Sequence, residues 1–271
     1  MSSERLELFY EAAGLPSFDL PDELALRYGG TLGFAEPRLV ANFVESLDGV
    51  VAIPSHPGSN RVIADSSSAD RFVMGLLRAC CDAVMIGAGT LAASPTSVWT
   101  PARAFPDASG AFAELRRRLG RGSDPELVVL SASGVLDEGH PALRAGALLL
   151  TTDRGADRLA GRLPRESRAL SLGADAALDP GRIVAVLAER GHRLILSEGG
   201  PHAIAPLLAA GLVDELFLTL SPLLLGRPGD DPRLALVEGA DLLAAGQSGA
   251  RLLGVRRATD HLFLRYALAG R

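Results

Sequence analysis

The stretch from Leu194 to His202, with the sequence LILSEGGPH, constrains the fold of this chain more than any other. A short apolar run stops at Glu198 and is followed at once by Gly199 and Gly200. This order predicts a buried strand that turns directly into a helix, because two glycines let the backbone turn, or approach a ligand, without a Cβ in the way. The amides that open a helix also attract phosphate through the helix dipole and their unpaired N–H groups.

A second glycine turn, Gly87 to Thr90, stands in the same context: the apolar run 82–86 precedes it and the apolar residues 91–93 follow it. Two such strand-end turns suggest a dinucleotide held across an open sheet, with the Thr90 hydroxyl available to a pyrophosphate. Neither turn has the full Gly-x-Gly-x-x-Gly spacing, which argues against a standard Rossmann domain. A plain tight turn is the alternative for both.

Short apolar runs alternate with helical patterns along most of the chain, which predicts an α/β fold with a mainly parallel sheet. The last two apolar runs flank Ala258–His261, which fits a tight turn, so we expect a C-terminal antiparallel hairpin at the edge of the sheet. Strands are expected at 39–44, 82–86, 127–130, 147–150, 169–172, 194–196, 214–221, 251–257 and 262–268, and helices at 68–79, 112–119, 154–161, 180–190 and 201–210.

The first 36 residues differ from the rest, because the segment 15–21 has turn chemistry and no sustained period follows it. We expect residues 1–36 to form an N-terminal extension that packs on the main body, and residues 37–271 to form one domain. The Pro-, Ser- and Gly-rich segment 94–111, which holds Trp99, is expected to be a long loop with a functional or mobile role.

Charge and composition exclude several classes of protein. The net charge of −5 argues against a nucleic-acid partner, because neutralising phosphates needs a basic face. No apolar run approaches the ~20 residues of a membrane span, and the N-terminus shows no secretion signal, so a cytoplasmic protein is expected. The adjacent Cys80 and Cys81 are expected to be small buried hydrophobes. No His, Cys and Asp cluster has metal-ligand spacing, so no metal is expected.

Several polar side chains outside the glycine turns are candidates to face a ligand. Glu198 ends its strand where open α/β sheets bind ligands, with a salt bridge as an equal alternative. Asn42 lies within an apolar strand, so its amide must find backbone or ligand partners. Asp48 follows that strand together with Ser46, and stabilising the Asp-Gly turn is its commonest use. Arg71 stands near a helix N-terminus, an unusual place for a cation, and either binds phosphate or is solvated.

Together these motifs resemble the reductase domain of riboflavin biosynthesis, a family of pyrimidine reductases with a dihydrofolate-reductase-like fold. The resemblance covers about residues 38–268. It rests on the order of NFVESLDG at 42–49, the helix at 71–79, DAVMIGAGT at 82–90, SEGGP at 197–201, LVDEL at 212–216 and SPLLLG at 221–226.

The resemblance implies a mixed sheet with flanking helices, NADPH as the cofactor and a homodimer. The implied reaction reduces the ribosyl group of an aminopyrimidine ribosyl 5′-phosphate to ribityl by hydride transfer to C1′, with Glu198 and Asp48 as candidate catalytic residues. The substrate-binding residues would be Asn42, Ser46, Asp48, Arg71 and Glu198. The cofactor-binding residues would be Gly87, Gly89, Thr90, Ser131, Ser133, Gly199, Gly200 and Pro201.

Departures from the family pattern keep two alternatives open, a dihydrofolate-type reductase acting on another heterocycle and a non-catalytic nucleotide-binding module. Many bacterial members carry lysine in place of Asn42 and Val50. Many also carry an N-terminal zinc deaminase domain, whose Pro-Cys-x-x-Cys signature is absent from this sequence. The apolar segments 216–220 and 223–225 are placed near the end of the sheet, where a second subunit, or else the N-terminal extension, is expected to cover them.

Overall fold

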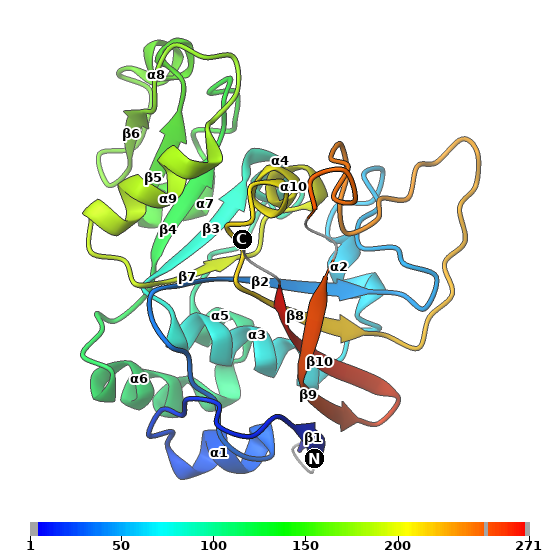
Figure 1. Ribbon diagram of the computed structural model, residues 1–271. Coiled ribbons are helices and arrows are strands. Elements are labelled where there is room, and N and C mark those ends of the chain that lie inside the picture. The colour runs from blue at the N-terminus through cyan, green and yellow to red at the C-terminus, as the bar shows by residue number, and fades with distance from the viewer. Residues whose placement is uncertain (1–4, 247–248, 269–271) are drawn as a thin grey trace.

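The computed structural model describes residues 5–246 and 249–268, and within them one ten-stranded sheet runs through the molecule (Figure 1). The strands lie in the order β1-β9-β10-β8-β2-β7-β3-β4-β5-β6. Their bounds are β1 (Glu7–Glu11), β2 (Arg38–Glu45), β3 (Ala83–Gly87), β4 (Glu126–Leu130), β5 (Ala147–Thr151), β6 (Arg168–Ser171), β7 (Leu194–Ser197), β8 (Glu215–Leu220), β9 (Ala250–Ala258) and β10 (His261–Leu268).

Neighbouring strands from β8 to β6 are parallel, whereas β1, β9 and β10 pair in antiparallel fashion at one edge. In the parallel part the chain passes from strand to strand through helices, as βα units require. The turn between β9 and β10 contains Thr259 with φ +47°, so the two strands form a tight hairpin. These pairings confirm the predicted α/β fold, with its mixed, mainly parallel sheet and its C-terminal antiparallel hairpin.

Helices cover both faces of the sheet (Figure 1). Those on one face include α1, α3 and α6, and those on the other include α9 and α10. The bounds are α1 (Asp22–Tyr28), α2 (Ser59–Ile63), α3 (Ser68–Cys80), α4 (Ala88–Ala92), α5 (Pro101–Ala104), α6 (Ser109–Arg118), α7 (Pro141–Ala145), α8 (Asp153–Leu159), α9 (Pro180–Glu189) and α10 (Pro201–Ala209), with a 3-10 turn at Pro106–Ala108.

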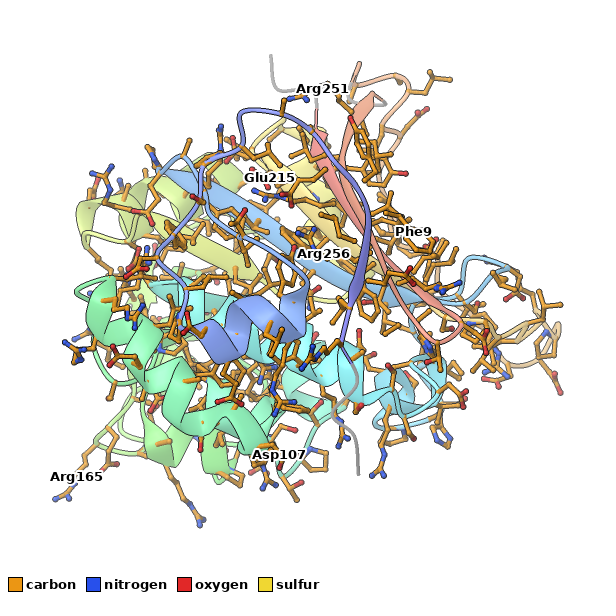
Figure 2. The ribbon with its side chains drawn as sticks, turned by 90° about the horizontal axis from the view of Figure 1, so that it is seen from below. Phe9, Asp107, Arg165, Glu215, Arg251 and Arg256 are labelled. Atoms are coloured by element: carbon orange, nitrogen blue, oxygen red, sulfur yellow. The ribbon has the colours of Figure 1, made fainter. Side chains whose placement is uncertain are left out.

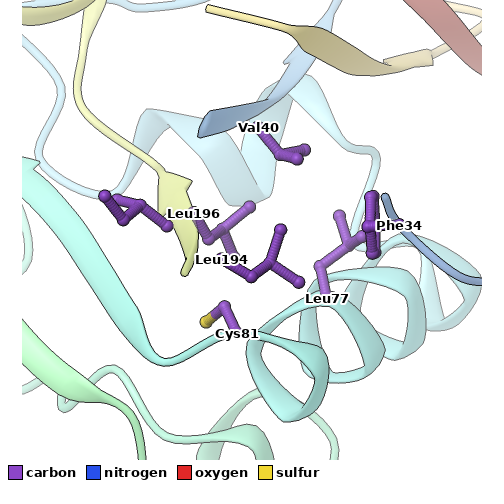
Figure 3. A pocket seen from close by; sticks show the side chains of 7 residues that line it. Phe34, Val40, Leu77, Cys81, Leu194 and Leu196 are labelled. Atoms are coloured by element: carbon purple, nitrogen blue, oxygen red, sulfur yellow. The ribbon is translucent and has the colours of Figure 1, made fainter. Parts of the chain in front are cut away.

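Helix α3 forms the inner layer beneath the sheet. The Ser67 hydroxyl caps its start by accepting a hydrogen bond from the Asp70 amide at 3.2 Å. Leu77 packs on Val40 and Leu196 of the sheet around a void with no room for a water molecule (Figure 3). Cys81 also lines this void; both cysteines are buried and unpaired, as predicted, and burial raises the pKa of each thiol.

The prediction of a long loop at 94–111 is wrong. The segment contains α5, the 3-10 turn and the start of α6. Thr100 caps α5 by accepting a hydrogen bond from the Arg103 amide at 3.2 Å, and Pro101 occupies the first helical position. Trp99 is buried against His140 rather than mobile. The composition suggested a loop, but proline and a capping threonine at adjacent positions are also typical of a helix start.

The expectation that residues 216–220 lie near the end of the sheet and need a second subunit to cover them is wrong. Strand β8 lies inside the sheet, paired with β2 on one side and with β10 on the other. Its apolar residues Leu216 and Leu218 pack against the layer that contains α9 and α10. The free edge of the sheet on this side is β1, where Leu8, Phe9 and Tyr10 are about half exposed.

Candidate functional site

The two glycine turns lie side by side, because β3 and β7 are neighbouring parallel strands. The Gly200 amide donates a hydrogen bond to the Thr90 hydroxyl at 3.1 Å, which ties one turn to the other. A Cβ on Gly199 would lie 3.0 Å from the Cβ of Ala203, and one on Gly87 would lie 3.2 Å from it. Both glycines therefore let α10 pack closely on the strand ends. This close packing is what the alternative of a plain tight turn predicts for them.

Gly89 differs from these glycines, because no heavy atom lies within 4 Å of the position of its missing Cβ. It is exposed in the first turn of α4, where the backbone amides have no partner within the helix. Pro201 stands at the first position of α10 across from it. The open side of the paired turns is thus lined by free amides and by the Thr90 hydroxyl, a set of donors that suits a phosphate.

Two serines continue this edge of the sheet. Gly87 pairs with Leu130, so Ser131 follows β4 directly beside the first glycine turn. Ser131 is buried, and its carbonyl accepts a hydrogen bond from the Thr151 hydroxyl at 2.7 Å. The Ser133 hydroxyl accepts a hydrogen bond from the Val135 amide at 3.3 Å. The structure therefore brings the expected cofactor residues together along the carboxyl ends of three adjacent strands, β7, β3 and β4.

Glu198 is held by a buried ion pair with Arg78 of α3. The Arg78 Nε and Nη2 atoms donate to the two carboxylate oxygens at 2.9 and 2.6 Å, and Nη1 donates to the Thr100 carbonyl at 3.3 Å. Both side chains are less than 10 % exposed, at 7 % and 9 %. A bidentate pair of this kind fixes the carboxylate in one orientation.

The last turn of α3, which carries Arg78, is itself anchored. A guanidinium nitrogen of the buried Arg116 donates to the carbonyls of Arg78, Ala79 and Cys81 at 3.2, 3.3 and 2.8 Å. These are carbonyls that a helix end leaves without intrahelical partners. The Arg78 backbone is thus fixed by contacts from α6, and its side chain by Glu198.

Asn42 lies next to this pair on the same face of the sheet. Ala41 of β2 pairs with Ser197 of β7, so Asn42 stands beside Glu198, and its neighbour Val40 points toward α3. The side chain is half-buried and makes no hydrogen bond to any residue that the structure describes. A half-buried amide without a protein partner is suited to a ligand.

Asp48 and Ser46 hold a loop rather than facing Glu198. The Ser46 hydroxyl donates to Asp48 Oδ1 at 2.6 Å, and the amides of Leu225 and Gly226 donate to the two carboxylate oxygens at 3.1 and 2.7 Å. These hydrogen bonds lower the pKa of Asp48 to about 2, with the Ser46 bond the largest cause. The carboxyl is ionised at neutral pH and has no proton to give, so its geometry favours the structural alternative over the expected catalytic role.

Arg71 and Arg78 differ in burial, which their spacing along the helix does not reveal. Arg71, in the first turn of α3, is exposed, whereas Arg78 is buried and reaches Glu198. The spacing places both arginines on roughly the same side of the helix, but it does not show which of them meets a residue 120 positions further on. Arg78 could have been identified from two features together: a carboxylate at the end of a strand, and an arginine on the side of a helix that faces the sheet.

A cavity of about 300 Å³ lies away from this site, at the amino ends of β4, β5 and β6. Its charged lining combines Glu126 and Glu166 with Arg165 and Arg168, and these groups already pair with one another. Among residues 5–246 and 249–268, no group of three or more His, Cys, Asp or Glu side chains is arranged to hold a metal ion. No helix in the same residues is both long and apolar enough to cross a membrane.

The model of the RibD C-terminal domain matches residues 37–245. A pyrimidine reductase-like protein of Corynebacterium diphtheriae superposes with a TM-score of 0.62 and 21% identity over 87% of this chain and 93% of its own. Acinetobacter baumannii RibD gives 0.62 and 20% over 90% of this chain and 60% of its own. The riboflavin biosynthesis reductase of Saccharomyces cerevisiae gives 0.56 and 14% over 91% and 98%. At these identities the structures show a shared fold, and no curated protein sequence matches the chain significantly.

Proposed function

Because this chain belongs to the RibD C-terminal domain family of riboflavin-biosynthesis pyrimidine reductases, we propose that it is an NADPH-dependent reductase that converts the ribosyl group of an aminopyrimidine ribosyl 5′-phosphate to ribityl. The observation that carries the proposal is the buried Arg78–Glu198 pair, which lies next to the paired glycine turns and beside Asn42, whose amide has no partner among the residues described. Donors for a nucleotide and polar groups for a substrate thus stand on neighbouring strands.

The cofactor would lie along the carboxyl ends of β7, β3 and β4. The free first-turn amides of α4 and the open space at Gly89 fit a phosphate, and the Thr90 hydroxyl would donate to the same group. NADPH supplies a hydride when it is bound, and the chain's own residues position and polarise the substrate. The residues proposed for this cofactor are Gly87, Gly89, Thr90, Ser131, Ser133, Gly199, Gly200 and Pro201.

The substrate would meet the face of the sheet that α3 covers. Glu198 is oriented by Arg78, so its charge can stabilise cationic character at the opened sugar without the side chain having to reorganise. Asn42 would bond the pyrimidine or the sugar, and the exposed Arg71 would meet the phosphate. Asp48 and Ser46 would hold the loop that borders this place. We also propose a cytoplasmic homodimer, for which the exposed apolar residues of β1 are a candidate surface.

Glu198→Gln is expected to lower turnover by about 10²-fold, because the loss of charge disturbs the ion pair that positions the reacting centre. Affinity for NADPH should change little, since the Glu198 carboxylate accepts its hydrogen bonds from Arg78 and not from the amides of the glycine turns. NADPH oxidation measured side by side against the ribosylaminopyrimidine phosphates and dihydrofolate gives both the activity and its substrate. Glu189→Gln, an exposed carboxylate of α9, is the matched control. Full activity of the Glu198 variant would remove this residue from the mechanism.

Gly89→Leu is expected to weaken NADPH binding about tenfold or more, roughly 1.4 kcal/mol, without lowering the free energy of unfolding. The new side chain meets no protein atom within 4 Å at its Cβ, and leucine favours a helix over glycine. It therefore fills only the space assigned to the cofactor. Gly110→Leu in α6, where the Cβ position is equally open, is the control. Titration of NADPH fluorescence checks both variants, and unchanged affinity in the Gly89 variant would contradict the cofactor placement.

A further inference from the structure

His140 connects two segments that leave neighbouring strands at the carboxyl ends of the sheet. The segment 87–94 follows β3 and contains α4, and the segment 131–140 follows β4 and begins with the two serines proposed for the cofactor. The strands β3 and β4 pair in parallel up to the last residue of each, so the two segments start side by side. Beyond that point they meet again where His140 Nε2 lies 3.0 Å from the Ser94 carbonyl oxygen.

The His140 ring is fixed at both of its nitrogens. Nδ1 accepts a hydrogen bond from the Ala142 amide at 3.1 Å, which caps the start of α7. Because the Ser94 carbonyl can only accept, Nε2 carries the proton of the ring and donates it to this oxygen. His140 is 2 % exposed, and the centre of its ring lies 6.2 Å from that of Trp99. The two nitrogens thus hold different elements, α7 at Nδ1 and the end of α4 at Nε2.

The hydrogen bond to Ser94 acts on the part of the chain that is proposed to hold the cofactor phosphate. Helix α4 is only five residues long, and the Ala93 amide donates to the Gly89 carbonyl at 2.9 Å. A displacement of residues 93–94 is therefore passed directly to Gly89. The Ala93 carbonyl also accepts a hydrogen bond from the Gly58 amide at 2.9 Å, so the loop that follows β2 is attached at the same place.

We propose that His140 is a positioning residue for the cofactor, and that its Nε2–H bond to the Ser94 carbonyl keeps the segments 87–94 and 131–140 at the separation that NADPH binding requires. This inference rests on the proposed function, which places NADPH along these two segments. Without the bond the segments would have to be ordered when NADPH binds, and this cost weakens binding. The substrate side is held separately, because Arg78 orients Glu198 through its own hydrogen bonds.

Two variants separate the two bonds of His140. Asparagine places an oxygen near the position of Nδ1 and is a good helix cap, but its side chain is too short to reach Ser94. Glutamine reaches about as far as Nε2 and can donate to the Ser94 carbonyl, but it has no acceptor at the position of Nδ1. His140→Asn should raise the Kd and KM for NADPH about three- to tenfold, which corresponds to one typical hydrogen bond, with kcat nearly unchanged. His140→Gln should keep the affinity for NADPH near that of the wild type and lower the free energy of unfolding instead.

Trp99 provides a second measurement that needs no cofactor, since it is the only tryptophan in the sequence and its ring lies near His140. Acrylamide should quench Trp99 fluorescence more strongly in the His140→Asn variant than in the His140→Gln variant. Both variants lack the imidazole ring, so the difference between them reports the bond to Ser94. His192→Asn is the matched control, because His192 bonds to Glu126 at the opposite, amino ends of the strands. It should change neither the quenching of Trp99 nor the affinity for NADPH.

The outcomes separate this inference from the proposed function. If the wild type binds NADPH and the His140→Asn variant binds it as tightly, His140 does not position the cofactor. The same conclusion follows if both His140 variants lose affinity in proportion to their loss of stability, or if acrylamide quenches Trp99 equally in both. If the wild type binds NADPH but reduces no ribosylaminopyrimidine phosphate, the reductase proposal fails and the comparison of Kd values still decides the role of His140. If the wild type binds no NADPH, the proposed function fails and this inference fails with it.

Discussion

Replacing Arg78 with methionine is expected to remove about 3–5 kcal/mol from the free energy of unfolding, the usual cost of leaving a buried charge without its partner. Glu198 is 9 % exposed and receives both of its charged hydrogen bonds from Arg78. The Thr100 carbonyl would lose a donor as well. Methionine keeps most of the apolar stem, so the loss reports the charge and its hydrogen bonds rather than a cavity. Urea unfolding of the Arg78→Met variant beside the wild type measures this loss.

The double variant Arg78→Met/Glu198→Gln completes a cycle. Because the double variant removes both charges, its loss of unfolding free energy should be smaller than the sum of the two single losses by about 1–3 kcal/mol. Arg117→Met serves as the control, since Arg117 is 73 % exposed and its pair with Glu114 lies at the surface, where ion pairs contribute little to stability. Equal losses in the Arg78 and Arg117 variants would contradict the buried ion pair.

The sequence predicts the sheet well where the signal is local. The glycine turns at Gly87 and Gly199 and the hairpin around Thr259 were found because turn residues adjoin clear apolar runs. Strand β1 and helix α1 were missed because the strand has no alternation of buried and exposed residues, and because α1 begins after Pro21 without a side-chain cap. Their stability comes from contacts with distant parts of the chain, which no local pattern records.

The candidate site could be predicted only in part, for the same reason. Glu198 was found from its place at a strand end, but its partner Arg78 lies 120 positions earlier in the sequence. The sequence left two uses open for Asp48, and it could not show that the carboxylate accepts hydrogen bonds from the amides of Leu225 and Gly226, which lie far along the chain. Local sequence patterns therefore do not identify the partner of a side chain when that partner is distant in the sequence.

Buried arginines connect the first 36 residues to the sheet. Arg256 of β9, labelled in Figure 2, donates to the Tyr28 carbonyl at 2.9 Å and to Glu11 at 2.6 Å. Its guanidinium carbon lies 3.9 Å from the centre of the Tyr28 ring. Arg265 of β10 donates to the Gly33 carbonyl at 2.8 Å. These contacts support the proposal that the N-terminal extension packs on the main body, over residues 5–36; residues 1–4 of that extension lie outside the described residues.

Arg265→Met is expected to cost about 3–5 kcal/mol of unfolding free energy, because Arg265 is 3 % exposed and its loss leaves the buried carboxylate of Glu215 without its main partner. Arg38 stays 3.9 Å from Glu215 and compensates only weakly. The Phe34 ring would also lose the cation that lies 4.9 Å from its centre.

The loss in the Arg265→Met variant should be accompanied by loosening of the N-terminal layer. Proteolysis under native conditions should cut within residues 1–36 faster than in the wild type, since the Gly33 carbonyl loses its donor. Arg257→Met is the matched control, because Arg257 is exposed and pairs with the exposed Glu7. Urea unfolding and the rate of cleavage report the two effects separately. If the Arg265 variant unfolds like the Arg257 variant and is cleaved no faster than the wild type, residues 1–36 are held by something other than this arginine.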